Sequence, residues 1–222
     1  MNVVAIVAHP DDEILGFGGV LAKHVDSGDV VSVVILGEGL TSRDKTIDKA
    51  LIEKLQSDAR LANEKIGVSA VYFDDLPDNE FDTIPMLAIA KKVEQYIADL
   101  SPHTIYTHHY GDLNIDHRKC AEAVQTAARP CHSCVKQIIA GEILSSTEWN
   151  VQDETTVFCP NRYVDIADSF DKKVAALLCY KSEVCTYPHP RSEEGVRILA
   201  EKRGLEVGLR YAEAFSIVRE IM

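Results

Sequence analysis

The chain has 222 residues and a net charge of −12, with no block of consecutive basic residues. These properties argue against nucleic acid or an anionic membrane surface as a partner. No segment approaches the roughly 20 apolar residues of a membrane span, and the N-terminus lacks the pattern of a secretory signal. We therefore expect a single domain over residues 1–222, a cytoplasmic location and six reduced cysteines.

The first half of the chain alternates between apolar strand patterns and amphipathic helix patterns. Residues 3–7 read Val-Val-Ala-Ile-Val, an unbroken run typical of a strand that is buried on both faces of a parallel sheet. This alternation predicts an α/β fold with a Rossmann-like, doubly wound and mostly parallel sheet that has helices on both faces. The expected strands are 3–7, 30–36, 68–76 and 104–108, and the expected helices are 14–25, 49–65, 86–100 and 117–128.

The pattern is weaker after residue 130. We expect strands at 136–144, 163–166 and 212–218, and helices at 168–180 and 193–209. Residues 131–134 read Cys-His-Ser-Cys, and a structural metal site with Cys179 and Cys185 or a redox pair are alternatives to plain reduced thiols. The sequence favours the plain thiols, because a redox pair normally opens a helix after a strand.

A first polar cluster lies between the first strand and the first helix, where residues 8–13 read Ala-His-Pro-Asp-Asp-Glu. Pro10 disfavours helical geometry at His9, so the backbone turns and His9 and Asp12 can converge. An imidazole and a carboxylate are two of the three protein ligands of a catalytic zinc ion, and Asp11 would lie beside its water. The alternative is an acidic helix start, which would explain Asp12 but not the histidine and proline before it.

A second polar cluster follows the fourth predicted strand, at residues 108–118. If the sheet reverses its order between the first and fourth strands, the carboxyl ends of both lie together. His117 then completes the metal shell. Asp116, its neighbour in sequence, suits the orientation of a ligand or of a catalytic histidine.

Two further segments carry candidate binding residues. Residues 187–192 read Tyr-Pro-His-Pro-Arg-Ser, and the two prolines make this a rigid segment that presents His189 and Arg191. The alternative is a simple connector between two helices. The polar segment 40–48 is expected to be a loop over the site, with Arg43 as its strong anion-binding group.

Three motifs together resemble the LmbE/PIG-L family of zinc-dependent de-N-acetylases. They are Ala-His-Pro-Asp-Asp-Glu with Leu-Gly-x-Gly-Gly at 8–19, Asp-x-Asn-x-Asp-His at 112–117, and Gly-x-x-Tyr-Ala-Glu-Ala-Phe at 208–215. The resemblance spans nearly the whole chain. It implies a Rossmann-like fold, one zinc ion per chain, homo-oligomers in many relatives, and hydrolysis of an N-acyl group, commonly acetyl on an amino sugar.

The resemblance also implies roles for individual residues. His9, Asp12 and His117 match the zinc ligands of the family, and Asp11 matches its general base. Many members have an oxyanion-stabilising histidine three residues before the last ligand, where this chain has Asn114. Asparagine donates a hydrogen bond but carries no charge. Either Asn114 alone stabilises the oxyanion or another group does so. We favour His189 for this role, because the two prolines beside it would hold it rigidly.

Two other functions remain open from the sequence. The chain could be a metal-binding family member without deacetylase activity, with Asn114 as its mark. It could also be a nucleotide-binding module, because residues 16–19 (Gly-Phe-Gly-Gly) and Glu38 faintly echo a dinucleotide fingerprint. The expected partner is a small N-acylated amino sugar or glycoconjugate, contacted by Arg43 and Arg191, in a pocket that Asp74 and Asp75 help to line.

Overall fold

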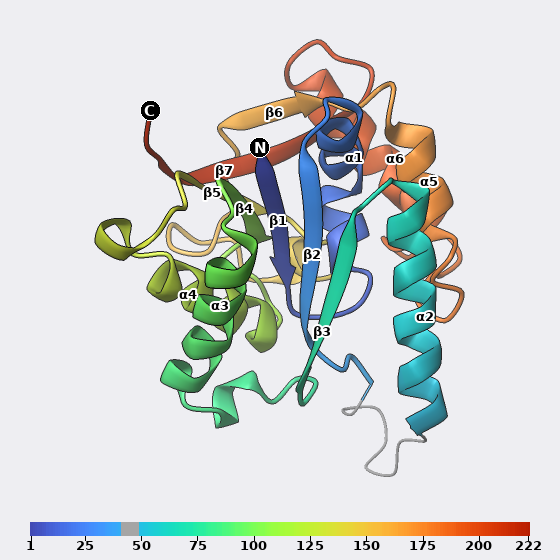
Figure 1. Cartoon of the computed structure of the whole chain (residues 1–222). Helices are drawn as coiled ribbons and strands as arrows, with labels where there is room; N and C mark the ends of the chain where they lie inside the picture. The colour runs from blue at the N-terminus through green and yellow to red at the C-terminus, as the bar shows by residue number, and fades with distance from the viewer. Residues whose placement is uncertain (41–48) are drawn as a thin grey trace.

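The computed structural model describes residues 1–40 and 49–222 and contains a seven-stranded sheet in the order β3-β2-β1-β4-β5-β7-β6 (Figure 1). β1 to β5 run parallel to one another, and β7 is antiparallel to β5 and β6. The prediction of a mostly parallel, doubly wound sheet is therefore confirmed. The strands are β1 (Asn2–Val7), β2 (Val30–Gly37), β3 (Ala70–Leu76), β4 (Thr104–His108), β5 (Gln137–Gly141), β6 (Arg162–Asp165) and β7 (Ala212–Glu220).

Helices cover both faces of this sheet. In Figure 1, α3 and α4 lie on one side and α1, α2, α5 and α6 on the other, each group with its own hydrophobic core. Alternate residues of β1 belong to the two cores, with Val3 in one and Val4 in the other, which explains its unbroken apolar sequence. The helices are α1 (Asp12–Asp26), α2 (Lys49–Lys65), α3 (Met86–Leu100), α4 (Ile115–Ala127), α5 (Phe170–Leu177) and α6 (Glu193–Leu205), with 3-10 turns η1 (Phe81–Thr83), η2 (Pro130–His132) and η3 (Thr147–Trp149).

The predicted elements differ from the observed ones mainly in the second half of the chain. The helix expected at 193–209 ends four residues early, at Leu205. The reason is a turn at Gly208, whose φ of 76° is left-handed and lets the Leu209 N–H bond the carbonyl of Gly204. The expected helix at 168–180 is likewise shorter, and the 3-10 turn η1 forms between β3 and α3.

The order of the sheet reverses at β1, which pairs with β2 on one side and β4 on the other. Connections leave this point in opposite directions, so a crevice forms at the carboxyl ends of the two strands. Residues 8–13 follow β1, and residues 109–118 follow β4. The topology therefore places both polar clusters at the same edge of the sheet.

A buried ion pair fixes α1, the helix that begins in this crevice. Lys173 Nζ lies 2.7 Å from Glu213 Oε1 and donates to the Leu15 carbonyl at 2.8 Å. Glu213 accepts the N–H groups of Gly19 and Val20 at 2.8 and 2.7 Å. The Tyr-Ala-Glu-Ala-Phe motif thus supplies an acceptor for backbone groups in the middle of α1.

Two expectations from composition concern cysteines and membranes. All six cysteines are free, and the candidate metal clusters among the described residues include none of them. The longest apolar helices in the described part of the chain are too short to span a bilayer.

Candidate active site

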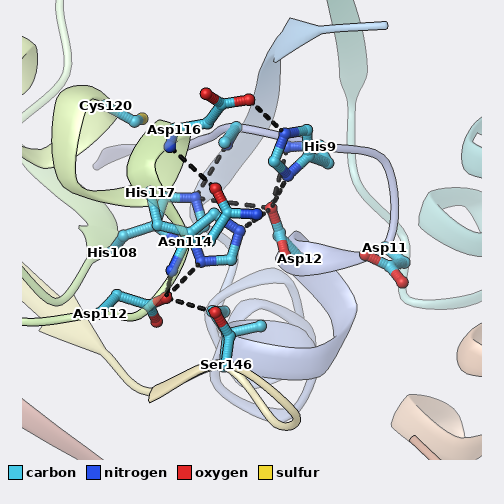
Figure 2. Close-up of polar contacts among 12 residues, drawn as sticks. His9, Asp11, Asp12, His108, Asp112, Asn114, Asp116, His117, Cys120 and Ser146 are labelled. Carbon is cyan, nitrogen blue, oxygen red and sulfur yellow. Dashed lines mark hydrogen bonds and ion pairs between the residues drawn. The ribbon is translucent and has the colours of Figure 1, made fainter. Parts of the chain in front are cut away.

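The turn from β1 into α1 aims two adjacent aspartates in different directions. Asp11 has a φ of 105°, a left-handed conformation that costs a residue with a Cβ on the order of 1–3 kcal/mol. The His9 N–H donates to Asp12 Oδ2 at 2.9 Å, which closes the turn. In Figure 2, Asp12 lies among the histidines and Asp11 points away from them.

The structure brings together the three residues that the sequence predicts as metal ligands. Their ligand atoms all lie within 4.8 Å of one another. Asp12 Oδ2 is 3.2 Å from His117 Nε2 and 3.5 Å from His9 Nδ1. Asp12 and His117 are buried, and His9 is 9% exposed, so the cluster opens toward solvent only at His9.

The residues of this cluster fit a zinc ion. Within the described part of the chain, Asp12 Oδ1 is buried and makes no hydrogen bond. Both ring nitrogens of His117 are also buried, and each lies 3.2 Å from a carboxylate oxygen, of Asp12 or of Asp112, without the geometry of a hydrogen bond. A buried polar atom without a partner costs about 1–3 kcal/mol, which coordination to a cation would remove. Two imidazoles and one carboxylate are also a donor set of catalytic zinc sites, which leave a fourth position open.

The electrostatics of the cluster also favour a cation. Burial lowers the pKa of His117, but the charges of Asp12 and Asp112 outweigh it and raise that pKa to about 9. The pKa of His9 is raised well above its usual range, because hydrogen bonds to Asp116, Asp12 and Asp78 outweigh its burial. The carboxylates therefore attract positive charge, and a metal ion that binds here would displace protons from the histidines.

Two carboxylates, one from the first turn of α4 and one from the loop after β3, hold the other side of the His9 ring. His9 Nε2 lies 2.9 Å from Asp116 Oδ2 and 3.1 Å from Asp78 Oδ1. Asp116 itself accepts the backbone N–H groups of Asn79 and Phe81, at 2.5 and 3.0 Å. This arrangement fixes the ring and leaves Nδ1 toward Asp12, as outer carboxylates do for metal-binding histidines. No sequence motif singles out Asp78, although it follows the carboxyl end of β3.

A second carboxylate supports His117. His117 Nδ1 lies 3.2 Å from Asp112 Oδ1, and Asp112 accepts hydrogen bonds from the hydroxyls of Ser146 and Thr147. Although burial raises the pKa of Asp112, the charge of His117 and these hydrogen bonds lower it to about 2, so Asp112 is ionised. Asp112 is the first residue of the motif at 112–117, but the motif alone does not predict this supporting role.

His108 packs against the same ring. Its ring stacks on His117 with centroids 4.0 Å apart, and its Nε2 accepts the Ala8 N–H at 2.8 Å. Burial and the charge of His117 lower the pKa of His108 to about 3, so it is a neutral ring that ties β4 to the end of β1.

Asp11 is paired with Arg191, 180 residues later in the chain. Arg191 Nη1 lies 2.9 Å from Asp11 Oδ2, and Arg191 Nε donates to Ser145 Oγ at 2.8 Å. Burial raises the pKa of Asp11 to about 8, against the opposing charge of Arg191. The segment 187–192 therefore brings one of its two predicted residues to the site.

A small polar cavity of about 110 Å³ lies beside the cluster. Asn114 lines it, with Oδ1 capping α4 through the Asp116 N–H and Nδ2 donating to Asn79 Oδ1 at 3.2 Å. His189 does not line it; its ring contacts Trp149, and its Nδ1 accepts the Arg191 N–H. The lining residues are His9, Pro10, Asp11, Gly39, Asp78, Asn79, Asn114, Glu183 and Arg191. A wider groove of about 1110 Å³ along α4 contains none of the three predicted metal ligands.

Two other residues that were expected to line the pocket lie elsewhere. Asp74 and Asp75 do not line the cavity, because both pair with Lys92 of α3. Arg43 lies outside the described residues.

The glycines of α1 serve packing: a Cβ at Gly19 would lie 2.8 Å from Ile166 Cγ2. Close packing therefore accounts for the Gly-Phe-Gly-Gly motif without a nucleotide phosphate.

Comparisons with known proteins identify relatives of this chain. The PIG-L family model, described as GlcNAc-PI de-N-acetylase, matches residues 4–128. The diacetylchitobiose deacetylase of Thermococcus kodakarensis is 27% identical over 98% of this chain and 83% of its own length. Its counterpart from Pyrococcus horikoshii has a similar structure, with a TM-score of 0.76 at 20% identity over 98% of this chain and 84% of that one.

The fold by itself does not fix the activity. GalB, a 4-carboxy-2-hydroxymuconate hydratase from Pseudomonas putida, also has a TM-score of 0.76, at 21% identity over 100% of this chain and 97% of that one. The family match is more specific, because it covers more than half of this chain and both polar clusters. The chain therefore belongs to the PIG-L family of de-N-acetylases, a family of hydrolases.

Proposed function

We propose that this protein is a zinc-dependent N-deacetylase that removes an acetyl group from an amino sugar or sugar conjugate. The observation that carries the proposal is the buried cluster of His9, Asp12 and His117, with Asp11 beside it on the wall of a polar cavity. The two diacetylchitobiose deacetylases support a sugar as the substrate. The cavity lining, which is rich in carboxylate and amide groups, suits the hydroxyls of such a ligand.

His9, Asp12 and His117 would hold one zinc ion, which when bound polarises the acyl carbonyl and makes water nucleophilic near neutral pH. Asp11 acts as the general base. Arg191 occupies its Oδ2, whereas no described residue hydrogen-bonds Oδ1, so Oδ1 accepts the proton of the attacking water. Burial raises the pKa of Asp11 above its usual range, so the carboxyl, once it has taken a proton from water, can hold that proton and return it to the leaving amine.

The surrounding residues hold this geometry. Asp116 and Asp112 fix the rings of His9 and His117, and Arg191 fixes the carboxylate of Asp11. Arg191 also lines the cavity, which is where a residue that contacts the substrate would have to lie. Its contact with the substrate stays a prediction.

Asn114 is the stronger candidate for the oxyanion donor, since it lines the cavity and His189 does not. We expect Asn114→Ser, which keeps an oxygen to cap α4, to lower kcat by about 10²–10³-fold. His189→Ala should keep turnover within about threefold, measured by steady-state kinetics. If His189→Ala lost most of its turnover and Asn114→Ser kept it, Asn114 would be rejected as the oxyanion donor and His189 would take that role.

The proposal is tested by offering N-acetylglucosamine and N,N'-diacetylchitobiose to the zinc-loaded protein and measuring free amine and acetate. Equal amounts of the two products, lost after chelation and recovered with zinc, are expected. Stoichiometric zinc without product from either sugar would reject the proposed activity on these substrates and favour a metal-binding member of the family without catalysis.

A further inference from the structure

Glu13 is the third acid of the first polar cluster, and neither the metal cluster nor the proposed proton transfer uses it. Its side chain is completely buried, on the side of α1 that faces α2 and α5. A buried carboxylate is costly unless hydrogen bonds satisfy it. Its partners therefore indicate what it does.

The two oxygens of Glu13 have different partners. Oε2 accepts the backbone N–H of Asp11 at 3.0 Å. Oε1 accepts the side-chain amide of Asn63, from α2, at 2.8 Å, and the hydroxyl of Tyr180, which follows α5. One oxygen is thus anchored to two packed helical segments, and the other holds the backbone of the proposed base.

The backbone that Glu13 holds is the left-handed one. Asp11 has a φ of 105° and is the N-cap residue of α1. Its carbonyl accepts the N–H groups of Ile14 and Leu15, the first hydrogen bonds of the helix, but its own N–H has no partner within the helix. Without Oε2 the N–H would have to find another acceptor, and the residue could relax toward a less strained conformation. Such a change would turn the carboxylate of Asp11 away from its position beside the cavity.

We infer that Glu13 is a positioning residue, which holds the strained backbone of Asp11 and thereby aims its carboxylate at the reacting water. The inference rests on the proposed function for the role of Asp11. Its structural part, the restraint on the backbone, is independent of any activity.

Glu13→Gln tests the inference with minimal change of shape. Three donors converge on the Glu13 carboxylate, and the amide of glutamine has only one oxygen. With that oxygen turned toward Asn63 and Tyr180, the NH₂ group faces the Asp11 N–H and cannot accept it. We expect kcat to fall by about 100-fold with KM within twofold and zinc content unchanged, because a misplacement near 1 Å has a cost of this size.

Tyr180→Phe is the matched control, since it removes a partner of Oε1 and leaves Oε2 on Asp11. Hydrogen exchange of the zinc-loaded proteins gives a readout that does not depend on catalysis. The Asp11 amide should exchange faster in Glu13→Gln than in the wild type, and at the wild-type rate in Tyr180→Phe.

Each outcome decides between the alternatives. Unchanged exchange and unchanged kcat in folded Glu13→Gln would overturn the inference. Equal losses of kcat and exchange protection in both variants would also overturn it, and would make the cluster a general support of the fold. If the wild type deacetylates neither sugar and the Asp11 amide still exchanges faster in Glu13→Gln than in the wild type, the restraint on the backbone is supported and the proposed function is rejected.

Discussion

Replacing Asp11 with asparagine is expected to lower kcat by about 10²–10⁴-fold while the protein keeps its zinc. General base catalysis has contributions of this size, and an amide cannot accept the proton of the attacking water. Asp11 is outside the cluster of ligand atoms formed by His9, Asp12 and His117, so the metal should stay. Elemental analysis and steady-state kinetics of Asp11→Asn measure the two effects separately.

The fold should tolerate this change, because two opposing effects accompany it. Burial disfavours the ionised form of Asp11, and the neutral amide removes that cost. Arg191 loses its closest carboxylate but retains Glu183 at 3.9 Å. Asp75→Asn, at an exposed position, is the control and should match the wild type. Loss of zinc from Asp11→Asn would make Asp11 a ligand and would overturn its assignment as the base.

His117→Ala is expected to abolish zinc binding and, with it, activity. The wild type should contain about one zinc per chain and the variant close to none, by elemental analysis of the purified proteins. Loss of an outer carboxylate already costs 10–100-fold in affinity or activity, and loss of a ligand should exceed that. The variant also leaves buried Asp12 without its closest imidazole, so its folding is checked by circular dichroism.

His103→Ala is the control for that experiment, since His103 is an exposed histidine just before β4 and is not one of the three proposed metal ligands. It should keep both zinc and activity. If the wild type took up no divalent metal, even after zinc was offered back at neutral pH, the proposed mechanism would be rejected together with the cluster as a metal site.

Local sequence patterns predicted the sheet and the location of the site. The apolar run at residues 3–7 and the repeated alternation of strand and helix fix the architecture, because burial on both faces leaves few other ways to place such strands. The polar residues after β1 and β4 then mark one crevice, and the structure brings His9, Asp12 and His117 together there. Boundaries were less predictable after residue 130, where β5 and α5 are shorter than their patterns.

Only the tertiary structure decided which residues support that cluster. Asp11 meets Arg191 across 180 residues, and Glu13 meets Tyr180 across 167. These pairs form because α5 and the segment before α6 pack beside α1, and no local periodicity encodes that contact. Asp112 and Asp78 likewise look like ordinary loop acids until the loops fold around the histidines. The sequence by itself determined the type of chemistry, through residues that are adjacent in the chain, while packing between distant segments determined how that chemistry is aimed.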